Sequence, residues 1–564
     1  MKKHILFFIS ITLLLSTASA QYRLQYKSYS IGGNDTSRTE VLRAGTQLKI
    51  QSADKPTEHP VPGKATHFTY IDYEQDTVIT QLFYQMDELY FSGSTIRKDY
   101  EFKMEGKEKV NGYNCIKYSI VLFSNKIELW TTEDLKFRAT PVASFASLPG
   151  VLVKYRRNGN AVLELTSITK DKSITELFPD NFGEKKNSTE LNQLEKDKLV
   201  ITTPIFEEEQ ICFNPTLGKP GRIEYDSVYR FANGTVILKK IDLTRLPEHY
   251  RIFAEVSEYS NGDAYDRTGS VFVIPFGKRQ SFLDALRDSI GALPYFTDKT
   301  GERYQGMSLT RTYIPLVEMV RFFTPFGVRH YNEYRSLGDQ EWAEKVYYKQ
   351  EISDLRPMLE GDVYIGAFIG NYDKGGHKLS LTLKAYPEDE RWSYSDSTVE
   401  MLLPLFNTCN VMEMAGQNYG KFFRTDSLSV DFYVPEGATE LKLRYIATGH
   451  GGWDTGDEFV PKANTILIDG KPKYIHTPWR GDCGTYRAAN PASGNFWNGM
   501  SSSDYSRSGW CPGTATQPVY FDLTDLEPGE HTMTVAIPQG EPEGGSFSSW
   551  CVSGALVGTF RKAQ

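Results

Sequence analysis

The chain has 564 residues, of which 63 are Lys or Arg and 71 are Asp or Glu, so its formal net charge is -8. This balance gives no basic field for nucleic acid or anionic lipid, and polyanionic partners are disfavoured. A single core seldom grows beyond about 250–300 residues, so the length predicts several domains, and we expect three. Aromatic residues make up 13% of the chain, which favours β-rich architecture because such rings pack well on a pleated surface.

The first twenty residues have the pattern of an export signal. A charged start, Met1 to His4, precedes an apolar run from Ile5 to Leu15 and a small-residue stretch that ends in Ala18-Ser19-Ala20, an Ala-x-Ala cleavage pattern. The apolar run is too short for a transmembrane helix. We therefore expect residues 1–20 to be a signal peptide and the mature chain, from Gln21, to be periplasmic or secreted without a membrane anchor.

Short alternating apolar runs occupy residues 21–177. The runs 77–84, 117–123 and 126–130 are separated by Gly, Asn and Asp, which is typical of strands joined by turns. This region is predicted to be a small antiparallel β domain. Residues 178–200 are rich in charged and small polar side chains, and we interpret them as a linker with one helix over 188–199. The alternative is a solvated helix that belongs to one of the neighbouring domains.

Two further groups of strands follow, one over residues 201–390 and one over 391–564. The first contains the runs 235–241, 250–256, 269–274 and 378–383, and the second contains 428–434, 441–446, 465–468 and 532–537. Many short strands with turn signals predict a β-sandwich in each region. Helical spacing of apolar residues over 279–290 predicts one helical insertion. The two sandwiches are expected to pack together and leave a cleft between their loop-rich ends.

Loops in the last region concentrate glycine, tryptophan and charged residues. They contain Gly449-His450-Gly451-Gly452-Trp453, Gly456-Asp457-Glu458-Phe459 and Arg507-Ser508-Gly509-Trp510-Cys511-Pro512-Gly513. Loops on a rigid scaffold commonly carry binding and catalysis. This block is therefore the first place to look for a functional site.

Five segments in one order resemble the bacterial peptide-N-glycosidase F family, whose members are two-jelly-roll amidases that remove N-linked glycans. The segments are Asp263-Ala-Tyr-Asp-Arg-Thr-Gly-Ser-Val-Phe-Val, Arg321-Phe-Phe-Thr-Pro-Phe, Tyr419-Gly-Lys, Gly456-Asp-Glu-Phe with Asn464-Thr-Ile-Leu-Ile-Asp, and Arg507-Ser-Gly-Trp-Cys-Pro-Gly. The resemblance covers roughly residues 200 to 564. It implies an all-β fold of two packed eight-stranded jelly-roll sandwiches, here preceded by the small antiparallel β domain.

The resemblance also implies catalytic residues. The family's principal acid lies in an acid-x-aromatic-Asp-Arg sequence, which matches Asp266, and a second family carboxylate falls seven residues before the Thr of the next strand, which matches Glu458 before Thr465. Arg507 matches the family arginine, and a guanidinium can clamp a carboxylate or an amide oxygen. Taken without the resemblance, Asp266 has the character of a surface-loop Asp in a turn.

Other side chains near these motifs are expected to bind substrate: Arg267, His450, Trp453, Asp457 and Trp510. Three of them have a second interpretation. Asp457 can hold its loop, His450 can cap a loop, and Trp510 can be a core tryptophan. The family's third carboxylate, in a Thr-Glu-Thr-Trp run, has no acid in register in the stretch 364–373, where Asp373 is the nearest substitute.

Six cysteines are too few for a disulfide scaffold. The resemblance implies a disulfide between Cys483 and Cys511. Cys409 and Cys551 either pair or remain buried thiols, and Cys115 and Cys212 are left open.

The resemblance predicts an amidase that hydrolyses the β-aspartylglucosaminyl bond of N-linked glycoproteins or glycopeptides, without a cofactor and as a monomer. The nine His residues include no His-x-His pair, so a copper site and any other metal site are rejected. No Gly-x-Ser-x-Gly elbow supports a catalytic triad. A non-catalytic glycan-binding protein is the stronger alternative, and a glycosidase, which also uses two carboxylates, is another.

Overall fold

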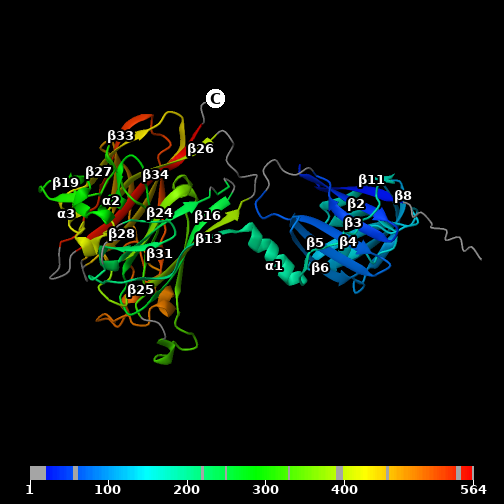
Figure 1. The fold of residues 1–564 in the computed structure, drawn as a ribbon, viewed down its shortest axis with the longest axis horizontal. Helices are drawn as coiled ribbons and strands as arrows, with labels where there is room; N and C mark the ends of the chain where they lie inside the picture. Colours follow the sequence, from blue (N-terminus) through cyan, green and yellow to red (C-terminus); the bar gives the residue numbers. More distant parts are fainter. Residues whose placement is uncertain are drawn as a thin grey trace, which may run out of the picture. The chain divides into compact units, whose positions relative to one another are not determined.

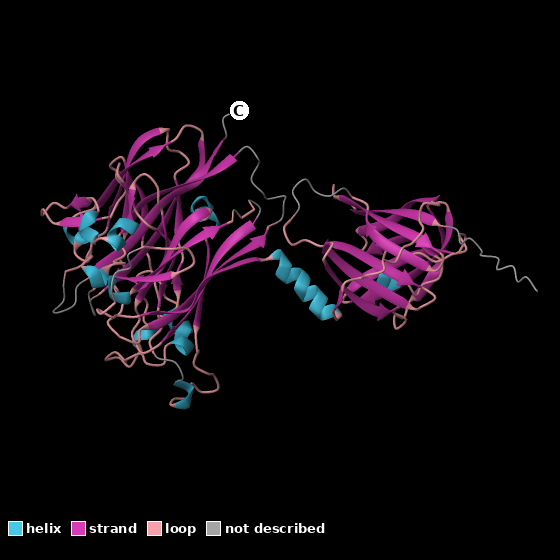
Figure 2. Ribbon diagram, viewed as in Figure 1, coloured by secondary structure: helices cyan, strands magenta, loops and turns pink. Residues whose placement is uncertain are grey.

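The structure is a computed structural model that describes residues 21–54, 61–217, 222–244, 246–247, 250–327, 331–388, 398–451, 456–541 and 548–561. The predicted signal peptide, residues 1–20, lies outside the described residues. The chain forms two compact units, Met1–Val200 and Ile201–Gln564, and strands dominate both (Figures 1 and 2). The two predicted sandwiches thus belong to one unit.

The first unit is built on one long sheet whose strand order is β12-β6-β5-β4-β3-β2-β1-β11-β10-β9-β8-β7. Its strands are β1 (Tyr22–Ser30), β2 (Thr36–Ala44), β3 (Gln47–Ser52), β4 (Thr66–Asp72), β5 (Thr77–Gln85), β6 (Glu88–Thr95), β7 (Lys103–Val110), β8 (Tyr113–Leu122), β9 (Asn125–Thr132), β10 (Val151–Arg157), β11 (Ala161–Lys170) and β12 (Glu184–Lys185). The pairings are antiparallel except for β12 with β6. Leu24, Val41 and Ile71 are fully buried in its main core, as alternation along half-buried strands requires.

The segment predicted as a linker is structured as part of this first unit. It supplies β12 and the helix α1 (Ser188–Leu199), which is the predicted helix. Asn187 and Glu190 form a capping box at the start of α1, satisfying two backbone donors that a helix end otherwise leaves free. Leu191 packs with Ala65 and Leu82 of the sheet region. The polar composition of residues 178–200 therefore reflects a largely solvent-exposed helix that buries one face.

The first sandwich packs a four-stranded sheet, β13-β25-β16-β23, on a six-stranded sheet, β14-β15-β24-β17-β22-β31. Its own strands are β13 (Ile201–Ile211), β14 (Val228–Phe231), β15 (Val236–Leu243), β16 (Tyr250–Ser260), β17 (Thr268–Ile274), β22 (Val317–Phe323), β23 (Val346–Glu351), β24 (Gly361–Ile369) and β25 (His377–Pro387). The predicted helical insertion is α2 (Phe282–Arg287) followed by a 3-10 turn, Ile290–Ala292. Short strands β18 (Gln280–Ser281), β19 (Tyr295–Thr297), β20 (Arg303–Gln305) and β21 (Tyr313–Ile314) flank it.

The second sandwich consists of two four-stranded sheets, β26-β34-β28-β32 and β27-β33-β29-β30. These strands are β26 (Thr398–Asn407), β27 (Leu428–Val434), β28 (Ala438–His450), β29 (Asn464–Ile468), β30 (Lys471–His476), β32 (Val519–Asp522), β33 (Gly529–Ala536) and β34 (Ser549–Arg561). A short helix, α3 (Phe422–Thr425), precedes β27. The strand β31 (Ala515–Thr516) leaves this sandwich and pairs with β22 of the first.

Buried charged and polar groups join the two sandwiches. Arg321 of β22 is ion-paired with Glu318, and its Nη1 atom donates to Thr448 Oγ1 of β28 at 3.2 Å. Arg444 of β28 donates from Nη1 to the Glu318 carbonyl at 2.9 Å, and Ser553 of β34 donates to the Glu318 carboxylate at 2.7 Å. Buried charges that are paired and hydrogen-bonded resist separation because breaking the network leaves an uncompensated charge. This network holds the two sandwiches, and with them the loops at their junction, in one relative position.

The all-β prediction is confirmed, whereas the jelly-roll connectivity stays a prediction. No helix among the described residues is long and apolar enough to cross a membrane.

Candidate active site

Three predicted residues meet at the junction of the two sandwiches. Arg507 donates from Nη1 to Asp266 Oδ2 at 2.9 Å and from the same nitrogen to Glu458 Oε1 at 2.5 Å. The Arg507 side chain is 1% exposed, while those of Asp266 and Glu458 each retain 18% exposure. Asp266 belongs to the first sandwich, and the other two residues belong to the second. One cation thus holds two carboxylates that face solvent from opposite sides of the junction.

The loop that carries Asp266 is held on both sides by one threonine. Thr324 Oγ1 donates to the Tyr265 carbonyl at 2.8 Å and accepts from the Arg267 amide at 2.7 Å. The Arg267 carbonyl then accepts from the Thr324 amide at 3.0 Å. These bonds fix the backbone immediately before and after Asp266, so the carboxylate is presented by an ordered loop between β16 and β17.

Burial raises the pKa of Asp266 to about 7, and the neighbouring Glu458 charge adds to the rise while Arg507 opposes it. Desolvation and a like charge both disfavour the ionised carboxylate. A carboxyl group with a pKa near 7 exchanges a proton readily at neutral pH, which is the property that a general base needs. Asp266 therefore has the electrostatic character of an acid-base group.

A second charged cluster lies beneath this loop. His377 Nδ1 is 2.7 Å from Glu258 Oε1, and its Nε2 is 3.5 Å from Asp263 Oδ2; all three side chains are buried. Burial disfavours the charged imidazole, but the two carboxylates outweigh it and raise the pKa of His377 to about 9. Asp263 also accepts from Arg267 Nε at 2.6 Å. The cluster joins the loop to β16 and β25, an anchor that sequence reasoning did not identify.

Arg507 is fixed by its backbone and by aromatic rings. Its amide and carbonyl exchange hydrogen bonds with those of Arg480, and Nη2 donates to the Ser502 carbonyl at 2.6 Å. The guanidinium carbon lies 4.4 Å from the centre of the Trp510 ring, which in turn stacks on Phe323 at 4.2 Å. A cation over an aromatic face is stabilised electrostatically, more so when desolvated. Arg507 is therefore held rigidly between the two carboxylates.

Trp510 does not form an exposed wall, as its predicted role in substrate binding requires. It is 2% exposed, and its Nε1 donates to the Gly449 carbonyl at 2.9 Å. The core alternative is the correct one for this residue, because its ring is covered by Phe323 and Arg507. Its part in the site is to support the arginine.

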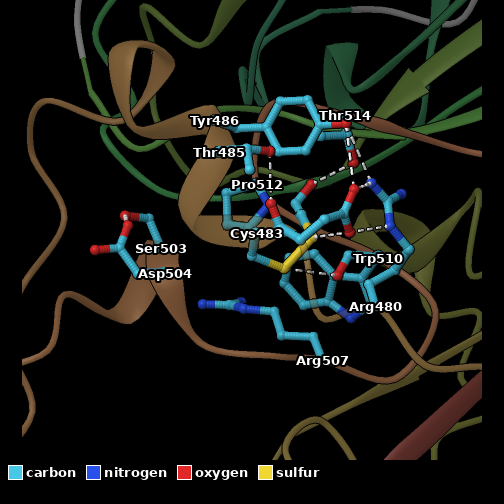
Figure 3. Close-up of a disulfide and its surroundings, with 12 residues drawn as sticks. Arg480, Cys483, Thr485, Tyr486, Ser503, Asp504, Arg507, Trp510, Pro512 and Thr514 are labelled. Carbon is cyan, nitrogen blue, oxygen red and sulfur yellow. Dashed lines mark hydrogen bonds and ion pairs between the residues drawn. A yellow bond between two sulfur atoms is a disulfide. The ribbon is translucent and has the colours of Figure 1, made fainter.

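The predicted disulfide between Cys483 and Cys511 is confirmed. It ties η8 (Cys483–Ala489) to the segment that carries Arg507 and Trp510 (Figure 3). Closing a loop of this kind restricts the unfolded chain and so stabilises the folded one. The other four cysteines are free and buried, and Cys409 is in hydrogen-bond contact with Cys551 without forming a disulfide.

The remaining predicted substrate residues have different surroundings. Asp457 is fully buried and accepts hydrogen bonds from Trp550 Nε1 at 2.6 Å and from the Gly540 amide at 3.0 Å. It therefore holds its loop, and its predicted role in substrate binding is wrong. His450 packs beside Phe323 and Trp510 with Nε2 2.8 Å from Thr448 Oγ1. Trp453 lies outside the described residues.

Arg267 points along the surface next to Asp266. Its guanidinium lies 4.9 Å from the ring centre of Tyr265 and 5.6 Å from that of Tyr372, and both tyrosines are exposed. The ion pair with Asp263 holds it in that position. Arg267 is therefore available to a ligand that approaches Asp266.

Glu413 is an acid near the site that sequence reasoning missed. It lies in η7 (Glu413–Ala415), accepts from Tyr372 Oη at 3.2 Å, and its Oε2 would be 3.2 Å from a Cβ atom placed on Gly370. Gly370 directly follows β24, and its amide donates to the Thr268 carbonyl at 3.0 Å. The carboxylate thus occupies the end of the strand where the resemblance lacks an acid. Burial raises the pKa of Glu413, although the residue as a whole remains exposed.

Asp373, the substitute suggested by the sequence, is engaged elsewhere. Its Oδ1 accepts from the Gly375 and Gly376 amides at 2.7 and 2.9 Å, an arrangement typical of a turn-forming Asp. In the described part of the chain, no group of three or more His, Cys, Asp and Glu side chains could hold a metal ion.

Two packed sandwiches hold a carboxylate–arginine–carboxylate centre in which the pKa of one carboxyl group is about 7, an arrangement suited to a hydrolase that uses acid-base chemistry. Residues 202–385 match the family model of the N-terminal domain of peptide-N-glycosidase F, and residues 418–557 match the model of its C-terminal domain. Residues 38–196 match a third model, which describes the N-terminal domain of an N-glycanase peptide. Two crystal forms of PNGF-II are each 40% identical to this chain, cover 97% and 96% of it and 99% of their own chains, with TM-scores of 0.79 and 0.81. The chain belongs to the peptide-N-glycosidase F family.

A shorter solved structure is that of PNGase F, a glycosylasparaginase from Flavobacterium meningosepticum. It is 16% identical, covers 64% of this chain and 96% of its own, and has a TM-score of 0.43. A comparison with curated proteins found no match.

Proposed function

We propose that the protein is an amidase that hydrolyses the bond between the Asn side chain and the first N-acetylglucosamine of an N-linked glycan. The observation that carries the proposal is the single Arg507 nitrogen that binds both Asp266 and Glu458. Membership of the peptide-N-glycosidase F family supports this substrate and not another amide. The products are a peptide with Asp in place of Asn and a glycosylamine, which decays to ammonia and free glycan.

Asp266 is the general base in this proposal. Amide hydrolysis needs a positioned water that loses a proton as it attacks the carbonyl carbon, and then a proton for the leaving nitrogen. With a pKa of about 7, Asp266 accepts the proton of the water and returns it to the leaving amine. Glu458, bound to the same arginine nitrogen, orients the water or the sugar amide from the other side.

Arg507 supplies fixed positive charge. The tetrahedral intermediate carries negative charge on the former amide oxygen, and a rigid, desolvated donor stabilises such charge far better than bulk water does. The cage of Trp510, the Ser502 carbonyl and the two carboxylates prevents the guanidinium from reorienting during the reaction. Arg267 and His450 contact the sugars on either side of the reacting bond.

Glu413 takes the place of the third family carboxylate. It approaches from the second sandwich instead of from a strand of the first, and its carboxylate lies over Gly370. An acid there, beside Tyr372 and within the field of Arg267, is suited to accept hydrogen bonds from sugar hydroxyl or acetamido groups.

The enzyme is exported by residues 1–20, acts as a monomer and uses the first unit to manage bulky glycoprotein substrates. Deletion of residues 21–200, which removes the whole first unit, tests the last point, since activity on a glycopeptide should persist while activity on an intact glycoprotein falls.

The deciding experiment is incubation with a denatured high-mannose glycoprotein followed by mass spectrometry of the glycosylated peptides. Conversion of Asn to Asp at the glycan site supports the amidase. A residual N-acetylglucosamine on Asn would instead identify a glycosidase, and an intact glycopeptide would identify a glycan-binding protein.

A further inference from the structure

A groove separate from the carboxylate centre crosses the junction of the two sandwiches. Its volume is about 520 Å³, and it is lined by β23 on one side and by the segments 476–480 and 513–519 on the other. It does not include Asp266, Glu458 or Arg507. Its residues have no part in the proposed reaction.

Exposed aromatic rings line this groove. Tyr347 is 78% exposed and Trp479 is 38% exposed. Tyr347 points outward because side chains alternate along β23, where the next residue, Tyr348, is buried. The Tyr486 ring adds a third face. Aromatic surface left open to water on a rigid strand and loop indicates a binding surface.

Both cations that line the groove are ion-paired. Lys349 is 3.0 Å from Glu255, and Arg480 makes two 2.7 Å hydrogen bonds to the carboxylate of Asp482. Paired cations offer little to a phosphate or another anion. The groove therefore suits a neutral ligand that has both an apolar face and many hydroxyl groups. Thr477 and Gln517 supply uncharged hydrogen-bonding groups beside the rings.

The back wall of the groove is attached to the site's arginine. Arg480 donates its amide to the Arg507 carbonyl at 2.8 Å and accepts from the Arg507 amide at 3.0 Å. The two side chains extend in different directions from this paired backbone (Figure 3). Gly509, which lines the groove, has a φ of 83°, and a Cβ atom there would lie 2.4 Å from the Ala447 carbonyl oxygen. The paired backbone of Arg480 and Arg507 therefore lies between the groove and the Arg507 side chain.

We propose that this groove is a second carbohydrate-binding site that takes one neutral pyranose ring, stacked on Trp479 and Tyr347. The pyranose presents C–H bonds to the aromatic faces and hydroxyl groups to Thr477 and Gln517, as amphipathic ligands do in apolar pockets with a few polar groups. In the context of the proposed amidase, on which this identification of the sugar rests, the ring belongs to the glycan being cleaved or to a neighbouring glycan on the same glycoprotein.

Kinetics with Trp479→Ala and Tyr347→Ala test the groove through three substrates: a glycopeptide with only two N-acetylglucosamine residues, one with a complete neutral glycan, and a peptide with two complete glycans. We expect KM for complete glycans to rise about threefold to tenfold with kcat unchanged, the range for loss of one aromatic contact. The short substrate should be unaffected. An effect with one complete glycan places the same glycan in the groove, while an effect confined to the doubly glycosylated peptide places the neighbour there. Equal effects on all substrates, or none, would overturn the proposal.

A binding measurement separates this proposal from the amidase reaction. Saturation-transfer NMR with free neutral oligomannose is carried out on Asp266→Asn protein, with and without Trp479→Ala. Tyr334→Ala is the matched control, since Tyr334 is 79% exposed and lies outside the groove. We expect Trp479→Ala to weaken the binding of oligomannose and Tyr334→Ala to leave it unchanged. Unchanged binding after Trp479→Ala rejects the groove, whether or not the protein proves to be an amidase.

Discussion

Asp266 Oδ2 lies 2.9 Å from Arg507 Nη1, although 241 residues separate the two in the chain. The contact joins a loop of the first sandwich to a disulfide-restrained loop of the second. Because Glu458 binds the same nitrogen, each carboxylate sets the electrostatic surroundings of the other. The predicted effects of substitution follow from this coupling.

Replacement of Asp266 by Asn should slow the reaction by orders of magnitude while stabilising the fold. Loss of a general base typically costs about 10²–10⁴-fold in kcat. The folded pKa of about 7 lies above the ordinary 3.8, so native stability falls as pH rises between these values. Removing the ionisable group removes this penalty, and we expect a gain of about 1–3 kcal/mol at neutral pH that disappears below about pH 4. Denaturant melts across this range, beside turnover assays, measure both effects. A variant with full activity would contradict the assignment.

The pH dependence of kcat/KM should report the same group. If the ionised Asp266 is the base, kcat/KM rises with pH and levels off above about 7. Glu458→Gln removes the negative neighbour that raises the Asp266 pKa. The residual activity of this variant should therefore level off at a lower pH than that of the wild type, and an unchanged or higher midpoint would exclude the coupling.

Glu413→Gln tests the third carboxylate, with Asp373→Asn as the matched control. Glu413 lies over Gly370 and binds Tyr372, whereas Asp373 only holds a turn. Loss of a charged hydrogen-bond partner of the substrate is worth about 1.5–3 kcal/mol. We expect kcat/KM to fall about 10–100-fold for Glu413→Gln and to change little for Asp373→Asn at temperatures where both are folded. Similar losses in the two variants would leave Glu413 with only a structural role.

The disulfide should stabilise the arginine loop. Cys483 and Cys511 are 28 residues apart, and a loop of that size predicts about 2–4 kcal/mol of stabilisation in the chain-entropy model. Cys483→Ser combined with Cys511→Ser should lower Tm and reduce kcat, because Arg507 is then less rigidly held. The double variant Cys409→Ser with Cys551→Ser is the control, as these cysteines do not form a disulfide. Equal activity with and without the disulfide would show that Trp510 and Arg480 suffice to hold the loop.

The β-rich fold was readable from alternation and turn residues, because strands such as β25 and β27 bury every second side chain on one face. The sequence did not show which of two adjacent acids faces the site. Asp457 and Glu458 are adjacent, yet Asp457 is buried by Trp550, which is 93 residues away. Glu413 was also invisible, since it lies in a 3-10 turn without a motif and reaches the site only through packing of the two sandwiches.

The cluster beneath the Asp266 loop predicts a second, separate loss of stability at alkaline pH. His377 has a folded pKa of about 9, above the ordinary 6.5, because Glu258 and Asp263 outweigh its burial. Its contribution is fully present below about pH 6.5 and is lost as pH rises through about 9. His377→Asn should thus lower the free energy of unfolding by about 2–3 kcal/mol at pH 6 and by less at higher pH. Urea melts of wild type, His377→Asn and Asp266→Asn from acid to alkaline pH separate this loss of stability from the one caused by Asp266. Only His377→Asn should remove the loss at alkaline pH. If the wild type keeps constant stability between about pH 6.5 and 9, His377 is not held as an imidazolium by these carboxylates.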